Sequence, residues 1–343
     1  MLAFEALARS RRSAAPGRTN LPYDVAPDAL GNLYVADTHN HRIQQFSPTG
    51  KLIRMRGRLG SGDGEFWQPR GIALDPFGNV WVADHENKRV QKFTADGRFL
   101  GRFGANGGDG TLGGGWGEFN SPRGLSSDAL GNIYVADDAN HRIVKLSNDG
   151  VTLAQWGRSD LRPGQGDGEF NLPYGTAVDR EGYLWVADTL NHRLVKMTTD
   201  GVVVAKYGAN GGDGTAGSGP GEFEELYNVA TDCVGNVYTT EKGNWRVQKL
   251  GDPASPRPVC PPRVTVGEVS VAGRVVSGTV TCDRPCRARA GRGRVRTLAS
   301  GGTARVRWRV PGSERRVAVR FSGTGAPGAS AGVTKRVRLA ARR

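Results

Sequence analysis

Hydrophobic and polar residues alternate over short stretches of this chain, and the stretches are grouped in a repeating unit. One asparagine marks each unit, at Asn40, Asn87, Asn140, Asn191 and Asn244, with spacings of 47, 53, 51 and 53 residues. A repeat of this length indicates an array of similar supersecondary units. The chain is therefore interpreted unit by unit before any single motif.

Each unit contains four stretches that are typical of β-strands. The second unit has an apolar stretch at 70–75, a strand that carries Trp81, an alternating strand at 89–93 and a fourth stretch at 97–103. An Asp-x-x-Gly turn joins the first two stretches in every unit, at Asp28/Gly31, Asp75/Gly78, Asp128/Gly131, Asp179/Gly182 and Asp232/Gly235. Aspartate can bond the backbone two residues on, and glycine accepts a positive φ, so this is a hairpin turn. Four strands per unit without helical periodicity predict an all-β fold, a β-propeller of four-stranded blades.

The units share the pattern P-x-G-[IL]-A-x-D-x-x-G-N-[VIL]-[YW]-V-A-D-x-x-N-x-R-[IVL]. This pattern resembles the NHL repeat, and the resemblance extends five times over roughly residues 1–250. It implies a propeller that usually has six blades, so five or six are expected. In a five-bladed ring, the stretch at 3–10, which matches 152–159, would complete the last blade and close the ring. The alternative is an N-terminal blade that is missing from the chain as given.

Charge divides the chain at a proline-rich segment. The chain has 47 Lys and Arg against 33 Asp and Glu, a net charge of +14. Residues 256–343 hold 20 basic and 3 acidic residues (+17), which leaves 27 and 30 (−3) for residues 1–255. We expect a propeller at 1–250, a stiff linker at 251–263 and a small basic domain, a β-sandwich or Ig-like fold, at 264–343.

The cysteines bear on the cellular compartment. Cys282 and Cys286 have no second pair and no nearby histidine, which makes a poor zinc site. A disulfide that joins Cys282 to Cys286 or to Cys260 is the favoured interpretation, and free structural thiols are the alternative. A disulfide would indicate an extracellular or cell-envelope protein, and free thiols a cytoplasmic one. Glu5 and Arg9 interrupt any signal-peptide core, and no run of eighteen apolar residues predicts a transmembrane segment.

The stretch VADTHNHRIQQF at 35–46 gathers groups that could bind a metal or perform catalysis. Every unit, however, repeats its acid, asparagine and arginine: Asp37/Asn40/Arg42, Asp84/Asn87/Arg89, Asp137/Asn140/Arg142, Asp188/Asn191/Arg193 and Glu241/Asn244/Arg246. A catalytic site is needed once, whereas a structural device is needed in every blade, so we predict that the trio holds a turn. His41, His141 and His192 recur in different blades, and we expect no zinc ion between them. No catalytic residue, metal or cofactor is predicted.

A binding site should instead vary from blade to blade. One residue stands before or at the start of each innermost strand, at one mouth of the channel: Tyr23, Arg70, Arg123, Tyr174 and Tyr227. Arginine presents a fork for carboxylate or phosphate, and tyrosine presents a face for stacking, so these five are the candidate ligand-binding residues. The alternative is that they close the channel by packing on one another. Two identical glycine-rich loops, 104–111 and 208–215, lie on the same face, and a binding or spacing role is favoured over calcium.

These features favour a non-enzymatic binding scaffold. We expect a monomer whose propeller binds a protein, peptide or polysaccharide on one face, and whose basic domain contacts an anionic polymer or surface. The alternative is a metal-dependent lyase or lactonase that acts at the channel mouth, so enzymatic activity stays open. The sequence contains no RING cysteines, no kinase signature and no nucleic-acid-binding module.

Overall fold

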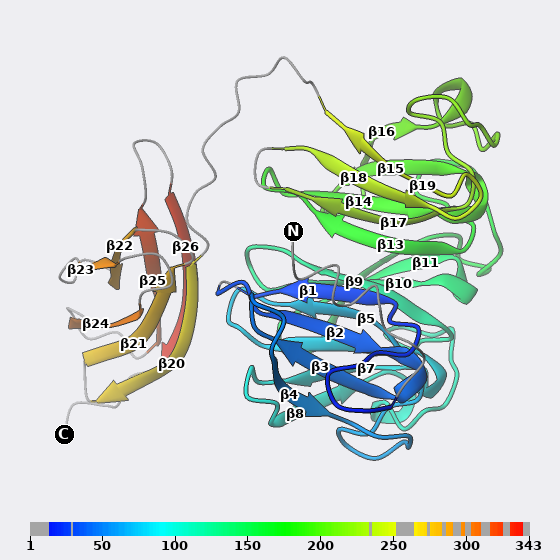
Figure 1. Ribbon diagram of the computed structural model, residues 1–343. Coiled ribbons are helices and arrows are strands. Elements are labelled where there is room, and N and C mark those ends of the chain that lie inside the picture. The colour runs from blue at the N-terminus through cyan, green and yellow to red at the C-terminus, as the bar shows by residue number, and fades with distance from the viewer. Residues whose placement is uncertain are drawn as a thin grey trace. The chain divides into compact units, whose positions relative to one another are not determined.

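The computed structural model describes residues 14–28, 30–232 and 235–251, together with the backbone of seven strands between residues 264 and 338. The chain divides into two compact units, and the main division falls between Pro256 and Arg257. The first unit contains five antiparallel sheets that follow one another in chain order (Figure 1). The prediction of an all-β propeller is confirmed, with five blades in the described residues.

Strands of one blade are adjacent both in sequence and in the sheet, so each blade is a simple meander. The first blade is β1 (Asp24–Pro27), β2 (Leu33–Asp37), β3 (Arg42–Phe46) and β4 (Leu52–Arg56), and the second is β5 (Pro69–Leu74), β6 (Val80–Asp84), β7 (Arg89–Phe93) and β8 (Phe99–Phe103). The third is β9 (Pro122–Ser127), β10 (Ile133–Asp137), β11 (Arg142–Leu146) and β12 (Thr152–Trp156). The fourth is β13 (Pro173–Val178), β14 (Tyr183–Asp188), β15 (Arg193–Thr198) and β16 (Val203–Tyr207), and the fifth is β17 (Leu226–Thr231), β18 (Val237–Glu241) and β19 (Arg246–Leu250).

The predicted Asp-x-x-Gly hairpin joins the first two strands of each blade. In the second blade, Gly78 has a φ of 82°, and Asp75 Oδ1 accepts a hydrogen bond from the Asn79 backbone N–H at 2.9 Å. The indole N–H of Trp81 donates to the other oxygen of Asp75 at 3.1 Å. One aspartate therefore fixes both the turn and the aromatic ring of the second strand.

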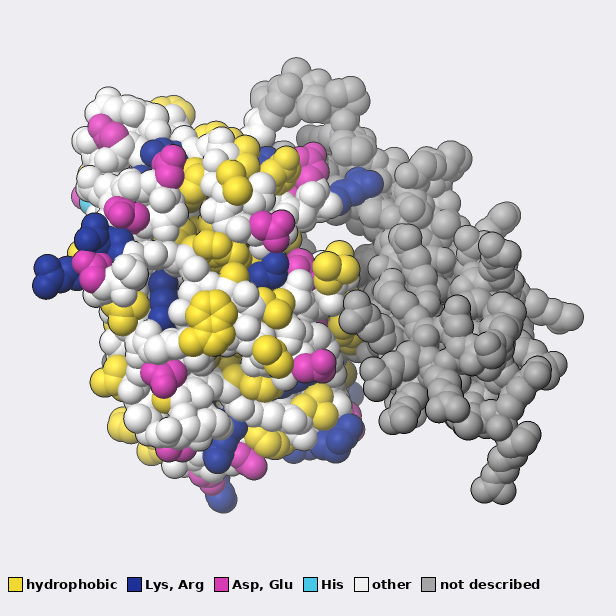
Figure 2. Space-filling model, turned by 180° about the vertical axis from the view of Figure 1, so that it is seen from behind, with side chains coloured by type: hydrophobic (Ala, Val, Ile, Leu, Met, Phe, Trp, Pro, Cys, Tyr) yellow, Lys and Arg dark blue, Asp and Glu magenta, His cyan; other side chains and the backbone are white. Residues whose placement is uncertain are grey.

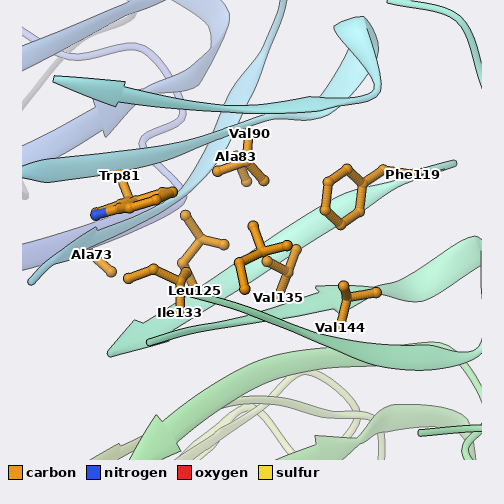
Figure 3. Packing of buried hydrophobic residues seen from close by; sticks show 10 residues of the cluster. Ala73, Trp81, Ala83, Val90, Phe119, Leu125, Ile133, Val135 and Val144 are labelled. Carbon is orange, nitrogen blue, oxygen red and sulfur yellow. The ribbon is translucent and has the colours of Figure 1, made fainter. Parts of the chain in front are cut away.

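The core of the propeller lies in the interfaces between consecutive blades, which we call seams. Four seams each hold a cluster of buried apolar side chains. Figure 3 shows the second seam, where the second and third blades pack through Ala73, Trp81, Ala83, Val90, Phe119, Leu125, Ile133, Val135, Val144 and Leu146. Because each blade buries its apolar face only against a neighbour, the array is stable only as a whole.

The phenylalanine of the recurring Gly-Glu-Phe sequence completes these four seams. Phe66, Phe119, Phe170 and Phe223 are at most 1% exposed. The glutamate that precedes each phenylalanine folds back on the loop, as Glu118 does when it accepts the Gly115 N–H at 2.8 Å. A side chain with this role was not predicted from the sequence, although the phrase itself is visible there.

The first and fifth blades do not meet in such a seam within the described residues. Thr19 stands in the first blade where the others have phenylalanine. On the fifth blade, Val247 is 69% exposed, whereas Val90 at the same place in the second blade is completely buried. The segment at 3–10 that was predicted to complete the fifth blade lies outside the described residues. The described residues between 14 and 251 thus show four packed seams.

The repeated acid, asparagine and arginine of each blade form a buried cluster, which we call the loop clamp. In the second blade, Asp84 Oδ2 accepts hydrogen bonds from Arg89 Nε at 2.8 Å and from Asn87 Nδ2 at 2.9 Å. Asp84 Oδ1 accepts the backbone N–H of Trp67 at 2.7 Å. The other clamps repeat the ion pair, at Asp37–Arg42 (2.6 Å), Asp137–Arg142 (3.1 Å), Asp188–Arg193 (2.8 Å) and Glu241–Arg246 (2.8 Å).

The clamp arginine also binds the loop that enters its own blade. Arg89 donates from Nη1 to the carbonyl oxygen of Ser61 at 2.6 Å, and from Nη2 to those of Gly62 at 2.8 Å and Glu65 at 3.1 Å. These donors satisfy carbonyl groups that no β-sheet partner reaches. The repeated motif therefore fixes where each innermost strand begins.

The second unit contains two antiparallel sheets. One has the order β20 (Val264–Ala272), β21 (Val275–Cys282) and β24 (Thr303–Arg309). The other has the order β23 (Arg296–Leu298), β22 (Cys286–Ala290), β25 (Arg316–Thr324) and β26 (Ser330–Arg338). The disulfide predicted among Cys260, Cys282 and Cys286 concerns side chains outside the described part of the chain.

The clamp predicts a graded loss of stability. In Arg89→Ala, Asp84 stays fully buried without its cation, and breaking such a pair costs about 3–5 kcal/mol. The matched variant Arg246→Ala affects a clamp whose arginine side chain is 28% exposed, so water replaces part of the interaction and a loss of about 1 kcal/mol is expected. Urea unfolding followed by tryptophan fluorescence measures both free energies of unfolding. Equal losses would contradict burial as the source of the effect.

Candidate functional site

The innermost strands β5, β9, β13 and β17 lie side by side around the centre of the first unit (Figure 1). Glycine permits this approach, because a Cβ on Gly71 would lie 1.8 Å from the Arg123 carbonyl oxygen. A Cβ on Gly124 would lie 2.4 Å from the Tyr174 carbonyl oxygen. The residue before each glycine is thereby brought next to its counterpart on the neighbouring blade.

Tyr23, Arg70, Arg123, Tyr174 and Tyr227 come together in one network, which we call the mouth cluster. The Tyr174 hydroxyl accepts hydrogen bonds from Arg70 Nη1 at 3.0 Å and from Arg123 Nη1. The Arg123 guanidinium lies 4.1 Å from the Tyr174 ring centre, and that of Arg70 lies 4.7 Å from the Tyr23 ring centre. The rings of Tyr174 and Tyr227 are 4.3 Å apart. The five side chains therefore pack on one another, and their role toward a ligand stays a prediction.

A second set of side chains surrounds this cluster, and the sequence analysis did not identify it. The residue after each clamp acid begins the short turn between the second and third strands: Thr38, His85, Asp138, Thr189 and Lys242. Asp138 forms an ion pair with Arg123, and His85 Nδ1 lies 3.2 Å from Ser121 Oγ. These residues could have been recognised in the sequence, because the position after the clamp acid varies between blades whereas the residues around it repeat.

Burial shifts the protonation of this second set. It raises the pKa of Asp138 to about 6, and it lowers that of His85 to about 4 with a further contribution from Arg70. Burial also raises the pKa of Tyr174. At neutral pH, His85 and Tyr174 are therefore uncharged, and Asp138 is the carboxylate that partly neutralises the two arginines.

Arg70 differs from Arg123 in having no direct ion pair, although the charge of Asp138 is close enough to interact with it. Within residues 14–251, no carboxylate lies in ion-pair distance of its guanidinium, and its Nε is buried without a hydrogen-bond acceptor. Thr189 Oγ1 and Asp138 Oδ1 are likewise buried and without a hydrogen-bond partner. A half-buried cation without a direct ion pair carries a desolvation cost that an anion can offset.

Asp24 takes the place that glycine occupies in three other blades. Its Oδ2 accepts the Ile72 N–H of the next blade at 3.0 Å, and its Oδ1 accepts the Val25 N–H at 2.9 Å. Burial nevertheless raises the pKa of Asp24 to about 7. In the fifth blade, Asn228 holds the same position and bonds the Val229 N–H in the same way at 2.8 Å.

The repeated histidines lie in three separate seams. Nδ1 of His41 accepts the Gln68 backbone N–H at 3.0 Å, and Nδ1 of His141 accepts that of Leu172 at 3.0 Å. His192 makes the same bond to Glu225 at 3.1 Å. In the described part of the chain, no group of three histidine, cysteine, aspartate or glutamate side chains is arranged to hold a metal ion.

The two identical glycine-rich loops adopt the same conformation. Each contains an asparagine with a φ of 49°, Asn106 and Asn210. The aspartate of each loop accepts a backbone N–H two residues on at 2.8 Å, from Thr111 to Asp109 and from Thr215 to Asp213. Both carboxylates are thus used to shape the loop.

Comparison with known proteins finds a similarity to one repeat family. The model of the NHL repeat family matches residues 19–46, 66–93 and 119–146. NHL repeat-containing protein 3 of Mus musculus is 37% identical over 86 residues, which are 24% of each chain. Peptidyl-glycine alpha-amidating monooxygenase of Mus musculus is 31% identical over 138 residues, 38% of this chain and 14% of that one. The chain thus spans about a quarter of the length of the first of these relatives.

Among solved structures, a catalytically inactive virginiamycin B lyase from Staphylococcus aureus with quinupristin overlaps the chain with a TM-score of 0.49 at 13% identity. The overlap covers 76% of this chain and 77% of the lyase. No helix in the residues that the structure describes is long and apolar enough to cross a membrane.

Asp24 predicts a stability that depends on pH. Its raised pKa means that the folded state holds the proton more tightly than the unfolded state, so the stability from this group is lost as pH rises from about 4 through 7. In Asp24→Asn, the charge is absent, the oxygen that accepts the Val25 N–H remains, and the hydrogen bond from the Ile72 N–H is lost. We expect the variant to be more stable than the wild type by over about 1 kcal/mol at pH 8, with a smaller difference at pH 5. An identical difference in urea unfolding at both pH values would show that Asp24 does not titrate in this way.

Proposed function

We propose that this NHL-repeat β-propeller protein is a non-enzymatic binding scaffold whose mouth cluster receives an anionic group of a peptide, protein or glycan. The observation that carries the proposal is Arg70, which is half-buried, forms no ion pair in the described residues and has an unpaired Nε. Arginine presents a planar fork that matches carboxylate and phosphate. An anion at Arg70 would supply the direct ion pair that Asp138 does not form with this guanidinium.

The surroundings of Arg70 support recognition of a ligand rather than mere closure of the channel. Tyr23 is 40% exposed and presents its ring beside the Arg70 guanidinium. Tyrosine and arginine are the residues that most often dominate binding energy at interfaces, because they combine apolar area with directed polar groups. A ligand that places an acid on Arg70 and an apolar or sugar face on Tyr23 would use both.

The charge of the remaining surface argues against a general polyanion site on the propeller. Lys and Arg are interspersed with Asp and Glu over the face of the first unit that Figure 2 displays. The propeller segment, residues 1–255, also carries a net charge of −3, from 27 basic and 30 acidic residues. Recognition of an anion by the propeller therefore depends on the local geometry of the mouth cluster and not on a broad field. The basic residues 256–343 are the proposed second contact, with anionic polymers or surfaces.

Two relatives bear names that describe amidating enzymes, the Mus musculus monooxygenase and a probable peptidyl-alpha-hydroxyglycine alpha-amidating lyase of Caenorhabditis elegans. A lyase or lactonase is therefore the competing function. Stoichiometric zinc or calcium in the purified protein, with turnover that is lost when the metal is removed, would establish the enzyme and refute the scaffold.

Arg70→Gln separates binding from stability. A panel of acidic peptides and uronic-acid glycans presented to the full chain should show ligands that the variant binds at least tenfold more weakly. The free energy of unfolding should stay the same or rise, because the substitution removes an unpaired half-buried charge. The matched control Arg98→Gln, on an exposed hairpin of the second blade, should bind like the wild type.

Two outcomes of this experiment would count against the mouth cluster. Loss of stability without loss of binding would assign Arg70 a structural role. Retention of polyanions that survives Arg70→Gln and disappears at high salt would place binding on the basic residues 256–343 instead.

Asp138 predicts a dependence of affinity on pH. Above its pKa of about 6 the carboxylate competes with a ligand for Arg123, so affinity for an anion should increase as pH falls from 8 to 5. Asp138→Asn should bind tightly at pH 8 and lose most of this dependence. The measurement needs a sulfated ligand, whose own charge is constant over the range. A parallel pH profile for wild type and variant would exclude Asp138 from the site.

A further inference from the structure

The last residue of the fourth strand covers the outer end of each packed seam. In the second, third and fourth blades it is an aromatic that stacks on the ring of its own second strand. Phe103 lies 5.3 Å from Trp81, Trp156 lies 6.3 Å from Tyr134, and Tyr207 lies 5.6 Å from Trp185, with interplanar angles of 26°, 13° and 28°. In three seams, the space over the aromatic residue of the second strand thus accommodates a flat aromatic ring.

The first blade breaks this rule. Arg56 pairs with Ile43 in the same register in which Phe103 pairs with Val90 and Trp156 with Ile143. Arg56 therefore stands where the ring would be. Its side chain is exposed, and it donates to the Asp96 carbonyl oxygen at 3.4 Å, which is a long hydrogen bond.

A pocket remains in the first seam beneath Arg56. Its inner wall is formed by buried apolar side chains of both blades, Ile43, Phe66, Val80, Val82 and Phe93, with Tyr34 beside them. The cavity has a volume of about 40 Å³. A water molecule needs roughly 10–15 Å³ and two to four polar partners, and walls of this kind offer it almost none.

Two arginines stand at the rim of this pocket. Arg54 and Arg56 are two residues apart on β4, so both side chains extend on the same face of the strand. Arg54 Nη1 donates to the Ala95 carbonyl oxygen at 3.2 Å, and neither arginine forms an ion pair within residues 14–251. The carboxylate of Asp96, in the hairpin between β7 and β8, accepts a hydrogen bond from Thr94 Oγ1 and interacts electrostatically with Arg54. Two guanidinium groups thus share one carboxylate at the rim.

We propose that this pocket binds a small aromatic carboxylate, with the ring in the first seam and the carboxylate on Arg54 and Arg56. The ring takes the place that Phe103, Trp156 and Tyr207 fill in the other seams, and the exposed Arg56 turns outward to admit it. The acid gains two guanidinium groups that form no ion pair within residues 14–251. The site lies in the outer part of the propeller and is distinct from the mouth cluster, so it does not rest on the proposed function.

The test is titration of the full chain with 3-phenylpropionate, followed by calorimetry and by ligand-observed NMR. The wild type should bind one equivalent, and 3-phenylpropanamide, which has the ring without the charge, should bind at least tenfold more weakly. Arg56→Phe should fill the pocket with the protein's own ring, abolish binding and raise the melting temperature. Arg54→Gln should keep the pocket and weaken binding about tenfold, since it removes half of the guanidinium pair.

Arg70→Gln serves as the matched control, because a carboxylate probe could also reach the mouth cluster. Binding of 3-phenylpropionate that is unchanged in Arg70→Gln and lost in Arg56→Phe places the ligand in the first seam. Binding that is unchanged in Arg56→Phe, equal affinity for the amide, or no binding at millimolar concentration would each overturn the proposal. If Arg56→Phe is poorly folded, Arg54→Gln and the amide still decide between these results.

Discussion

The buried ion pair of the loop clamp is the interaction on which the rest of the propeller depends. In each blade it ties the end of the second strand to the third strand, and it bonds the carbonyl groups of the loop that enters the blade. Because one arginine satisfies several carbonyls at once, an irregular loop can be buried against the sheet without unpaired polar groups. The entry point of every innermost strand is set in this way, and with it the position of the mouth cluster.

Repetition decides which residues can carry function. The clamp and the Asp-x-x-Gly turn recur because each blade needs them, and the phenylalanine recurs because each packed seam needs it. The polar groups of these residues bond within the protein. Departures from the pattern are different, because nothing in the fold demands them. Arg70 without a carboxylate, Asp138 after a clamp acid and Arg56 in place of an aromatic are three such departures. Arg70 and Arg56 leave charge or space that a neighbouring blade does not use, and Asp138 adds a carboxylate beside Arg123.

The fold was largely predictable from the sequence, because a four-strand unit repeated five times leaves few alternatives. The turns, the strand order and the convergence of the five mouth residues follow from register alone. The packing between neighbouring blades does not follow from register. The exposure of Val247 and the pocket beneath Arg56 depend on which side chain of one blade contacts which side chain of the next. Asp138 could have been found by comparing the units position by position. Its raised pKa could not, because that shift comes from its burial in the folded protein.

A crystal structure of the full chain with its tightest acidic ligand would test the central claim most directly, namely that recognition takes place where the innermost strands begin. The account predicts an acidic group of the ligand within about 3 Å of the Arg70 guanidinium, with Tyr23 against the ligand. Arg123 should then have exchanged part of its contact with Asp138 for the ligand. A ligand bound by the outer strands or by the basic residues 256–343, with Arg70 still unpaired, would contradict the account.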